Sequence, residues 1–248
     1  MHSKTALVTG GSSAIGREVA MALASQGMTV AVCSRRAEGG QATVDALREA
    51  GGDAFLVRFD GRHADATRDA IQSVVDRCGS IDVAVNNAGG TLGRSGTVAD
   101  FDVDSWDEIL DANLRTTWLT LKYEMKHMVA QGHGAIVNNI GALGVRAVPG
   151  MCAYVAAKHA VVGLTKTAAV EGAAFGVRVN AVAPSMTERY EPDDEAAERA
   201  RGAAEAIPLG RIARADEVAA CVAWLCSDAS SFVTGDVLMV DGGITISF

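Results

Sequence analysis

Tyr154 and Lys158, in the stretch YVAAK, stand four residues apart and form the pair most suggestive of chemistry in this sequence. On a helix this spacing places both side chains on one face, about 6 Å apart along the axis. An ammonium group beside the phenol favours the tyrosinate form and lowers the phenol pKa from about 10 towards the working pH. Such a tyrosine exchanges a proton with an alcohol oxygen while a nicotinamide cofactor handles the hydride. Because Tyr-x-x-x-Lys is common in helices, the pair needs the support of other motifs.

A glycine-rich turn, TGGSSAIG at 9–16, follows the first apolar run of the chain and precedes a helical pattern. Glycines let the backbone turn sharply and approach a pyrophosphate, which the free N–H groups of the helix start can bind. The alternative is a plain tight turn between a strand and a helix. The position after the first strand of an alternating chain favours a dinucleotide. The predicted contacts in this turn are Gly10, Ser12, Ser13, Ile15 and Gly16.

The end of the second apolar run bears on the choice between NAD and NADP. An acidic residue there would accept hydrogen bonds from the adenosine ribose, but this chain has Ser34, Arg35 and Arg36. Guanidinium groups pair with a 2′-phosphate through charge-assisted hydrogen bonds, so the sequence favours NADP over NAD. One of the two arginines is expected to face solvent only. Asp60, followed by Gly61, is the predicted acceptor for the adenine amino group.

Seven short apolar runs must position these residues. They lie at 5–10, 29–34, 54–59, 82–87, 134–139, 177–183 and 237–243. Near-continuous apolar strands of this length are typical of a parallel sheet buried on both faces, and the segments between them have helical spacing and closing glycines. We therefore expect one α/β domain over 1–248, with a doubly wound, Rossmann-like parallel sheet of about seven strands and helices on both faces.

Composition excludes several classes of function. The net charge of −8 and the pI of about 5.1 argue against nucleic acid or an anionic membrane as the main partner. Five cysteines without ligand spacing indicate neither a disulfide framework nor a metal site. No stretch of about 18 apolar residues predicts a transmembrane helix, and the start has no signal-peptide core. The expected location is the cytoplasm.

Together these motifs resemble those of the short-chain dehydrogenase/reductase family, in its single-domain form of about this length, from end to end. TGGSSAIG is similar to the cofactor turn, Tyr154 with Lys158 to the catalytic pair, and TG…VDGG at 234–243 to the family's ending. The motif NNAG at 86–89 is similar to the family's fourth-strand motif, which adds Asn87, Ala88 and Gly89 to the cofactor contacts.

The resemblance also implies roles for single residues. Lys158 would bind the nicotinamide ribose as well, and Arg35 would read the 2′-phosphate. Asn113, in DANLRTTW, would bend its helix and hold a proton-relay water. The stretch PSMT at 184–187 takes the place of the family's Pro-Gly and of a threonine that contacts the nicotinamide carboxamide. Its predicted cofactor contacts are Pro184, Ser185 and Thr187.

Three departures from the family pattern stand out: Ala14 and Ser185 replace glycines, and Gly141 stands where the catalytic serine is expected, thirteen residues before Tyr154. No hydroxyl side chain occurs from 135 to 153. Losing such a donor costs on the order of 10²–10³ in rate. Three explanations stay open: Asn139 or a water replaces the donor, the substrate is an enone, a quinone-like ring or otherwise activated, or turnover has been lost and only cofactor binding remains.

The sequence says least about which residues contact the substrate and about the oligomeric state. The expected wall includes Gly141, Leu143 and Met151 together with an acidic, alanine-rich segment at 186–206. That segment is predicted to be a solvated surface helix, a mobile lid, or both. Arg189 and Tyr190 are either its polar contacts to the substrate or simple surface residues. The apolar wall suggests a hydrophobic or cyclic substrate. Apolar helical stretches at 104–130 and 154–173 predict a homotetramer, with a dimer as the alternative.

Overall fold

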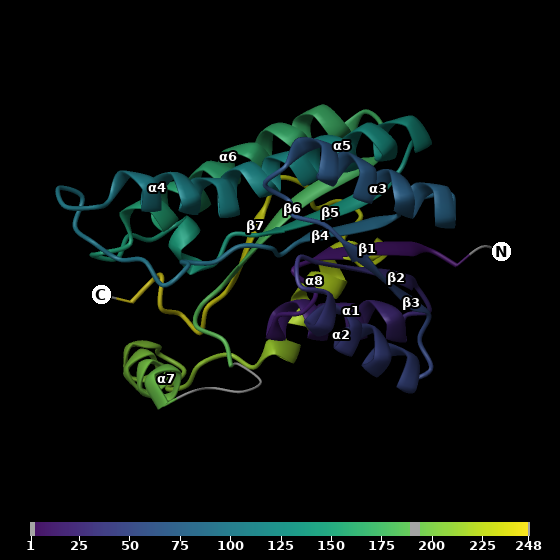
Figure 1. The fold of residues 1–248 in the computed structure, drawn as a ribbon. Helices are drawn as coiled ribbons and strands as arrows, with labels where there is room; N and C mark the ends of the chain where they lie inside the picture. The colour runs from purple at the N-terminus through teal and green to yellow at the C-terminus, as the bar shows by residue number, and fades with distance from the viewer. Residues whose placement is uncertain (1–2, 189–193, 248) are drawn as a thin grey trace.

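The computed structural model describes residues 3–188 and 194–247. Its core is one parallel sheet with the strand order β3-β2-β1-β4-β5-β6-β7 (Figure 1), which confirms the predicted doubly wound fold. The strands are β1 (Thr5–Thr9), β2 (Thr29–Ser34), β3 (Ala54–Arg58), β4 (Val83–Asn86), β5 (Gly134–Asn139), β6 (Val177–Pro184) and β7 (Val237–Val240). The order reverses between β1 and β4, and such a switch point opens a crevice beyond the carboxyl ends of the strands.

Helices cover both faces of the sheet (Figure 1). They are α1 (Ala14–Ser25), α2 (Ala37–Glu49), α3 (Ala64–Cys78), α4 (Val103–Leu110), α5 (Thr116–Gln131), α6 (Cys152–Ala173), α7 (Asp194–Ala206) and α8 (Ala215–Cys226). Along β1, Ala6 and Val8 pack into the core under α1, α2 and α8, whereas Leu7 packs into the core under α3, α5 and α6. This alternation of two buried faces explains why the strand sequences are almost continuously apolar.

Two irregular elements lie at the carboxyl end of the sheet. A π-helical turn (Asp111–Arg115) joins α4 to α5. It contains the buried Asn113, whose Nδ2 donates to the carbonyl oxygens of Gly90 and Ile109, both at 2.9 Å, and whose Oδ1 accepts from the Gly90 N–H at 2.9 Å. π-turns of this kind are frequent at functional sites. A short 3₁₀ turn, η2 (Ala142–Gly144), follows β5.

Helix α7 occupies most of the segment expected to be a surface helix or lid. It lies at the same end of the molecule as α4, where the strands have their carboxyl ends (Figure 1). Arg189 and Tyr190, the predicted polar residues of this segment, fall outside the described residues. No helix of the described ranges is long and apolar enough to span a membrane.

Candidate active site

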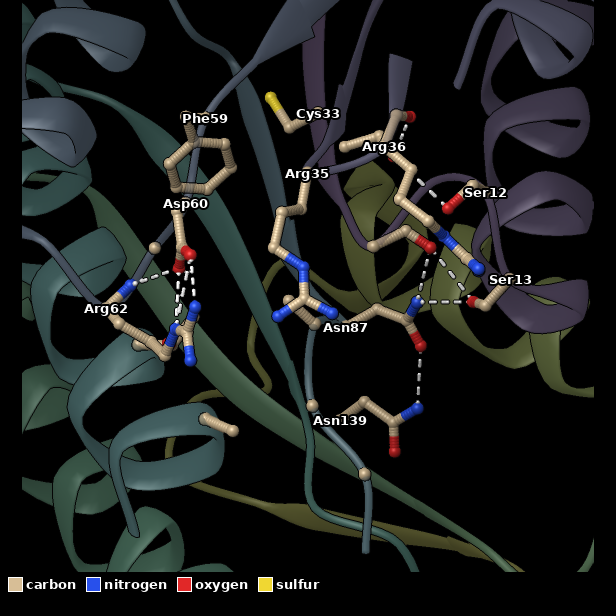
Figure 2. A pocket seen from close by; sticks show the side chains of 18 of the residues that line it. Ser12, Ser13, Cys33, Arg35, Arg36, Phe59, Asp60, Arg62, Asn87 and Asn139 are labelled. Atoms are coloured by element: carbon tan, nitrogen blue, oxygen red, sulfur yellow. Dashed lines mark hydrogen bonds and ion pairs between the residues drawn. The ribbon is translucent and has the colours of Figure 1, made fainter. Parts of the chain in front are cut away.

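A cavity of about 400 Å³ opens at the carboxyl ends of β1, β2, β4 and β5 (Figure 2). Most of the predicted cofactor residues line it, namely Gly10, Ser12, Ser13, Ile15, Ser34, Arg35, Arg36, Asp60, Gly61, Asn87, Ala88, Gly89, Tyr154 and Lys158. The glycine turn and the Tyr-Lys pair, which the chain separates by more than a hundred residues, therefore share one hollow. The topology brings them together because parallel strands end at the same edge.

The glycine turn is closed by reciprocal hydrogen bonds. Ser13 is the N-cap of α1: its Oγ accepts from the Gly16 N–H at 3.1 Å and donates to the Gly10 carbonyl at 2.9 Å. Gly16 does not line the cavity. A Cβ added to it would lie 2.2 Å from the Gly10 carbonyl oxygen, so this glycine lets the helix pack directly under the turn. Ser13 and Ile15 at the start of α1 line the cavity, so a helix N-terminus, which favours anions, lies at its wall.

Asn87 connects this turn to β5. Its Nδ2 donates to the Gly10 carbonyl at 3.2 Å and to Ser13 Oγ at 3.0 Å, and its Oδ1 accepts from Asn139 Nδ2 at 2.9 Å (Figure 2). Asn139, a candidate replacement for the missing serine, therefore uses one of its two amide hydrogens on Asn87. Its Oδ1 accepts from the Gly141 N–H at 3.1 Å.

Tyr154 and Lys158 lie on α6, as their spacing predicts. The Lys158 Nζ is 5.6 Å from the centre of the Tyr154 ring and donates to the Asn139 carbonyl at 2.8 Å. Burial lowers the pKa of Lys158 to about 8 and raises the pKa of Tyr154 to about 12. The expectation that lysine lowers the phenol pKa is thus wrong for the protein alone. The ammonium faces the ring and the Asn139 carbonyl, and desolvation of the phenolate is the larger effect.

Gly141 lies beside the tyrosine, as the counting from the family pattern predicted. Its backbone has a φ of +62°, and a Cβ added to it would lie 3.4 Å from Tyr154 Oη and 3.8 Å from the Pro184 carbonyl oxygen. A small side chain therefore has room here, although the left-handed backbone disfavours any residue except glycine. Leu143 lies in the following 3₁₀ turn, and Met151 caps α6 and pairs with Gly96.

The stretch at 184–188 lies outside the 400 Å³ cavity. Pro184 is buried at the end of β6, and Thr187 Oγ1 donates to the Ser185 carbonyl at 3.1 Å. Ser185 borders a separate cavity of about 210 Å³, and its buried Oγ has no hydrogen-bond partner among the described residues. The three residues that were predicted to hold the nicotinamide side are therefore adjacent to the cavity edge rather than on its wall.

The far end of the cavity is basic. Arg35 and Arg36 are exposed, and in Figure 2 both guanidinium groups project over the hollow. Neither guanidinium group forms an ion pair with any residue of the described ranges. Ser34 is buried: its Oγ donates to the Arg36 carbonyl at 2.8 Å and thereby fixes the loop that carries both arginines.

Several lining residues were not predicted from the sequence. They are Cys33, Phe59, Arg62, Gly90, Ala112 and Thr116. Arg62 is the most consequential of these, because it forms a close ion pair with Asp60, the predicted adenine acceptor (Figure 2). Its position two residues after Asp60, in the same loop, is the signal that could have indicated it. Within the ranges that the structure describes, no cluster of side chains has the composition of a metal site.

Known proteins match this chain over its full length. A family model described as enoyl-(acyl carrier protein) reductase matches residues 10–245. The cyclohexanol dehydrogenase of Acinetobacter sp. (strain SE19) is 36% identical over 245 residues, 98% of this chain and 96% of that protein. The crystal structure of levodione reductase matches with a TM-score of 0.94 at 30% identity over 100% of both chains. A gluconate 5-dehydrogenase from Burkholderia cenocepacia J2315, in complex with NADP and tartrate, matches with a TM-score of 0.91 at 31% identity, over 100% of this chain and 97% of that one.

Proposed function

The chain belongs to the short-chain dehydrogenase/reductase family, and we propose that it transfers a hydride between NADP(H) and a carbonyl or alcohol carbon of a hydrophobic or cyclic substrate. One observation carries this proposal. A single cavity joins the N-terminus of α1, two arginines without ion-pair partners in the described chain, and the pair of the half-buried Tyr154 and the buried Lys158. The first two features suit a dinucleotide with an extra phosphate, and the pair suits proton transfer at its other end.

The residues present fit such a cofactor. The turn closed by Ser13 offers backbone N–H groups for the pyrophosphate, and Asn87 holds that turn against β5. Arg35 and Arg36 are free to pair with the 2′-phosphate. NADP was found in the related gluconate 5-dehydrogenase, which supports the choice of NADP over NAD. When bound, the reduced cofactor supplies the hydride.

Tyr154 gives a proton to the carbonyl oxygen in reduction and takes it back in oxidation. Lys158 lies beside the Tyr154 ring and is fixed by the Asn139 carbonyl, so it would hold the nicotinamide ribose next to the phenol, as the resemblance implies. The Asn113 side chain is hydrogen-bonded to Gly90 and so fixes the loop after β4, and the resemblance implies that Asn113 would hold the proton-relay water.

The proposed substrate class follows from the wall of the site. The wall is the one predicted from the sequence, since Gly141, Leu143 and Met151 do not line the 400 Å³ cavity: Gly141 would contribute no side chain, and Leu143 and Met151 would contribute apolar ones. One relative is named for cyclohexanol and one structural neighbour for levodione. These names support a cyclic or hydrophobic ketone as the first substrate class to test.

The proposed assembly is a homotetramer, with a dimer as the alternative, in the cytoplasm. Trp118 on α5 is 42% exposed and Val170 on α6 is 80% exposed, which suits helices that pack against a second copy. Leu121, on the same apolar stretch as Trp118, packs into the core of its own chain instead. The acidic surface continues to disfavour nucleic acid and membranes as partners.

The first experiment measures NADPH and NADH affinities, followed by oxidation of each with a panel of cyclic ketones, quinones and enones. We expect NADPH to bind more tightly, and Arg35→Ala to weaken NADPH binding about tenfold with little effect on NADH. Arg58→Ala is the control, because Arg58 ends β3 and is exposed outside this cavity. The assignment of NADP would be contradicted if Arg35→Ala lost the same amount of affinity for NADPH and for NADH, or if the wild type bound NADH more tightly than NADPH.

A second candidate function is conjugate reduction of a C=C bond, and the absence of a hydroxyl at Gly141 favours it. Without that donor a carbonyl oxygen is polarised less, whereas the β-carbon of an enone accepts a hydride more readily than a simple ketone does. Product analysis with one enone separates the two reactions. A saturated ketone indicates conjugate reduction, and an allylic alcohol indicates carbonyl reduction. Tight binding of NADPH with no turnover on the whole panel would instead support a cofactor-binding protein.

A further inference from the structure

The loop between β4 and α4 contains a leucine whose backbone is left-handed. Leu92 has a φ of +54°, and no other non-glycine residue of the described ranges has a positive φ. The Arg94 N–H donates to the Thr91 carbonyl at 3.0 Å and closes a tight turn, in which the second central residue, Gly93, also has a positive φ, of +71°. Glycine, asparagine and aspartate dominate the central positions of such a turn, because other side chains crowd the backbone there. The turn itself therefore gives no reason for a leucine.

Hydrogen bonds on either side hold this turn in place. Before it, the Asn113 side chain bonds both the N–H and the carbonyl of Gly90, each at 2.9 Å. After it, the Gly96 N–H donates to the Gly150 carbonyl at 3.0 Å, shortly before α6 begins. The loop is therefore fixed to the π-turn on one side and to the start of the helix that carries the tyrosine on the other. The left-handed backbone at Leu92 belongs to an anchored loop.

Leu92 lines the 400 Å³ cavity and is 46% exposed. Gly89, three residues before it, shows which end of the cavity this is, because a Cβ added to Gly89 would lie 3.5 Å from Lys158 Nζ. Two other large apolar side chains line the cavity, one on the α1 turn and one directly after β3, both at the dinucleotide end: Ile15 and Phe59. Leu92 is thus the large apolar side chain that the described lining offers at the end of the proton-transfer pair.

Two features of Leu92 are unfavourable in the protein alone. Its backbone conformation crowds a side chain, and nearly half of the residue meets water. An apolar ligand group that covered the side chain would offset both. The other side chains that line this end, those of Asn139, Tyr154 and Lys158, are polar. A ligand that suits this end therefore has a polar atom for the tyrosine and a hydrocarbon surface for the leucine.

We propose that Leu92 is a specificity-determining residue, which packs against the hydrocarbon ring of a ketone whose oxygen meets Tyr154. A ring covers more of the leucine than a short chain does, and each buried apolar area adds to binding in proportion. The inference rests on the proposed function, since it requires that a carbonyl compound is reduced at Tyr154. It adds to that function the side chain that selects a cyclic substrate.

The test replaces Leu92 by asparagine in the full-length protein. Asparagine has nearly the shape of leucine and tolerates a positive φ, but its amide group is polar. For Leu92→Asn we expect the melting temperature to rise by about 2 °C, because the backbone is relieved. We expect kcat/KM for cyclohexanone to fall about tenfold, mainly through KM, and kcat/KM for propanone to change less than about twofold. A residue that only held the loop would change stability and activity in the same direction, and would affect both ketones alike.

Two further variants complete the comparison. Leu92→Met keeps an apolar side chain and should hold the KM for cyclohexanone within about twofold of the wild-type value. Val98→Asn is the matched control, because Val98 is 85% exposed in the same loop and does not line the cavity. Neither its melting temperature nor its ratio of the two ketones should change.

The inference fails if the wild type does not prefer cyclohexanone to propanone in kcat/KM, or if Leu92→Asn loses the same factor on both ketones. An equal loss of NADPH affinity in Leu92→Asn also contradicts it, since Leu92 would then contact the cofactor. If bound NADPH is oxidised by neither ketone, equilibrium binding of cyclohexanone to the NADPH complex replaces kcat/KM, and Leu92→Asn should again lose about tenfold. A wild type that binds no NADPH contradicts the proposed function, and the inference with it, and the cofactor titration shows this outcome separately.

Discussion

The cofactor end and the substrate end of the site are built in different ways. At the cofactor end, Ser13 and Asn87 make reciprocal hydrogen bonds with the backbone of the glycine turn, and Ser34 fixes the arginine loop. At the substrate end, Gly141 offers no side chain, so no hydroxyl group stands where the family pattern has its serine. NAD and NADP share the same pyrophosphate, so the part of the site that would hold it can be built from the backbone and its caps. The substrate differs from one family member to another, and the substrate end of the site is formed by small residues and loops.

The first test of this difference removes the Tyr154 phenol, which lies between the cofactor end and the substrate end of the site. Tyr154→Phe should lower kcat at least a thousandfold, because the phenol is the group that exchanges the proton with the substrate oxygen in the proposed mechanism, while the NADPH affinity changes less than threefold. Single-turnover kinetics alongside a cofactor titration measure both quantities. Lys158→Met is the companion variant and should weaken cofactor binding as well as turnover. Normal turnover of Tyr154→Phe would remove the proposed mechanism.

The second test concerns the cofactor end alone. In Gly16→Ala the new methyl group would meet the Gly10 carbonyl oxygen at 2.2 Å, so the turn must open. We expect the NADPH dissociation constant to rise about a hundredfold and the protein to lose about 2–3 kcal/mol of stability, the range for a forced contact in a packed region. Gly163→Ala on α6 is the control, since nothing lies within 4 Å of its Cβ and alanine favours a helix. An unchanged affinity in Gly16→Ala would show that the turn tolerates a side chain.

The same contrast explains what the sequence could predict. All seven strands lie where the apolar runs placed them, because a strand buried on both faces must be apolar throughout and is followed by a glycine-rich turn. The glycine turn, Asn87 and the Tyr154–Lys158 pair all reach one cavity, because their roles depend on local spacing and on which edge of the sheet the strands end at.

What the sequence did not predict depends on side chains meeting across loops. Asp60, which stays the predicted acceptor for the adenine amino group, also forms an ion pair with Arg62, a contact that no periodicity records. The pKa of Tyr154 was expected to fall and instead rises to about 12, because burial by the surrounding chain disfavours the phenolate. Arg189 and Tyr190 lie outside the described residues, so their roles remain predictions.

A buried carboxyl group lies beneath both ends of the site and gives the third test. Glu124 on α5 is fully buried and accepts from Asn86 Nδ2 at 2.8 Å, and the same Nδ2 donates to Asn138 Oδ1 at 3.0 Å. Burial raises the pKa of Glu124 from 4.5 to about 7. A carboxyl whose pKa is raised on folding stabilises the fold fully below the unfolded value, and this stabilisation is lost as the pH rises through 7.

Wild-type stability should therefore fall between pH 5 and pH 8, by up to about 3 kcal/mol from this group. Glu124→Gln keeps a neutral side chain that can donate to Asn86 Oδ1, which has no partner in the described chain. The variant should match the wild type at pH 5 and exceed it by about 2 kcal/mol at pH 8. Urea unfolding at both pH values measures this, with Glu171→Gln, an exposed position on α6, as the surface control. Parallel pH profiles for Glu124→Gln and the wild type would show that Glu124 is ionised throughout.

The smallest expected effect lies at Gly141 and addresses the substrate end directly. A serine there would carry its Cβ 3.4 Å from Tyr154 Oη, so its hydroxyl can reach a carbonyl oxygen held by the tyrosine. We expect Gly141→Ser to raise turnover of simple ketones about tenfold, because it restores part of a donor effect of 10²–10³. It should also cost about 1–3 kcal/mol of stability, because the φ of +62° with a ψ of 163° is a backbone conformation confined essentially to glycine. Gly141→Ala has the same backbone strain without the hydroxyl. A gain shared by both variants would mean that shape rather than hydrogen bonding limits the reaction. No gain in either would mean that polarisation of the carbonyl comes from elsewhere, and the second N–H of Asn139 is then the group to substitute next.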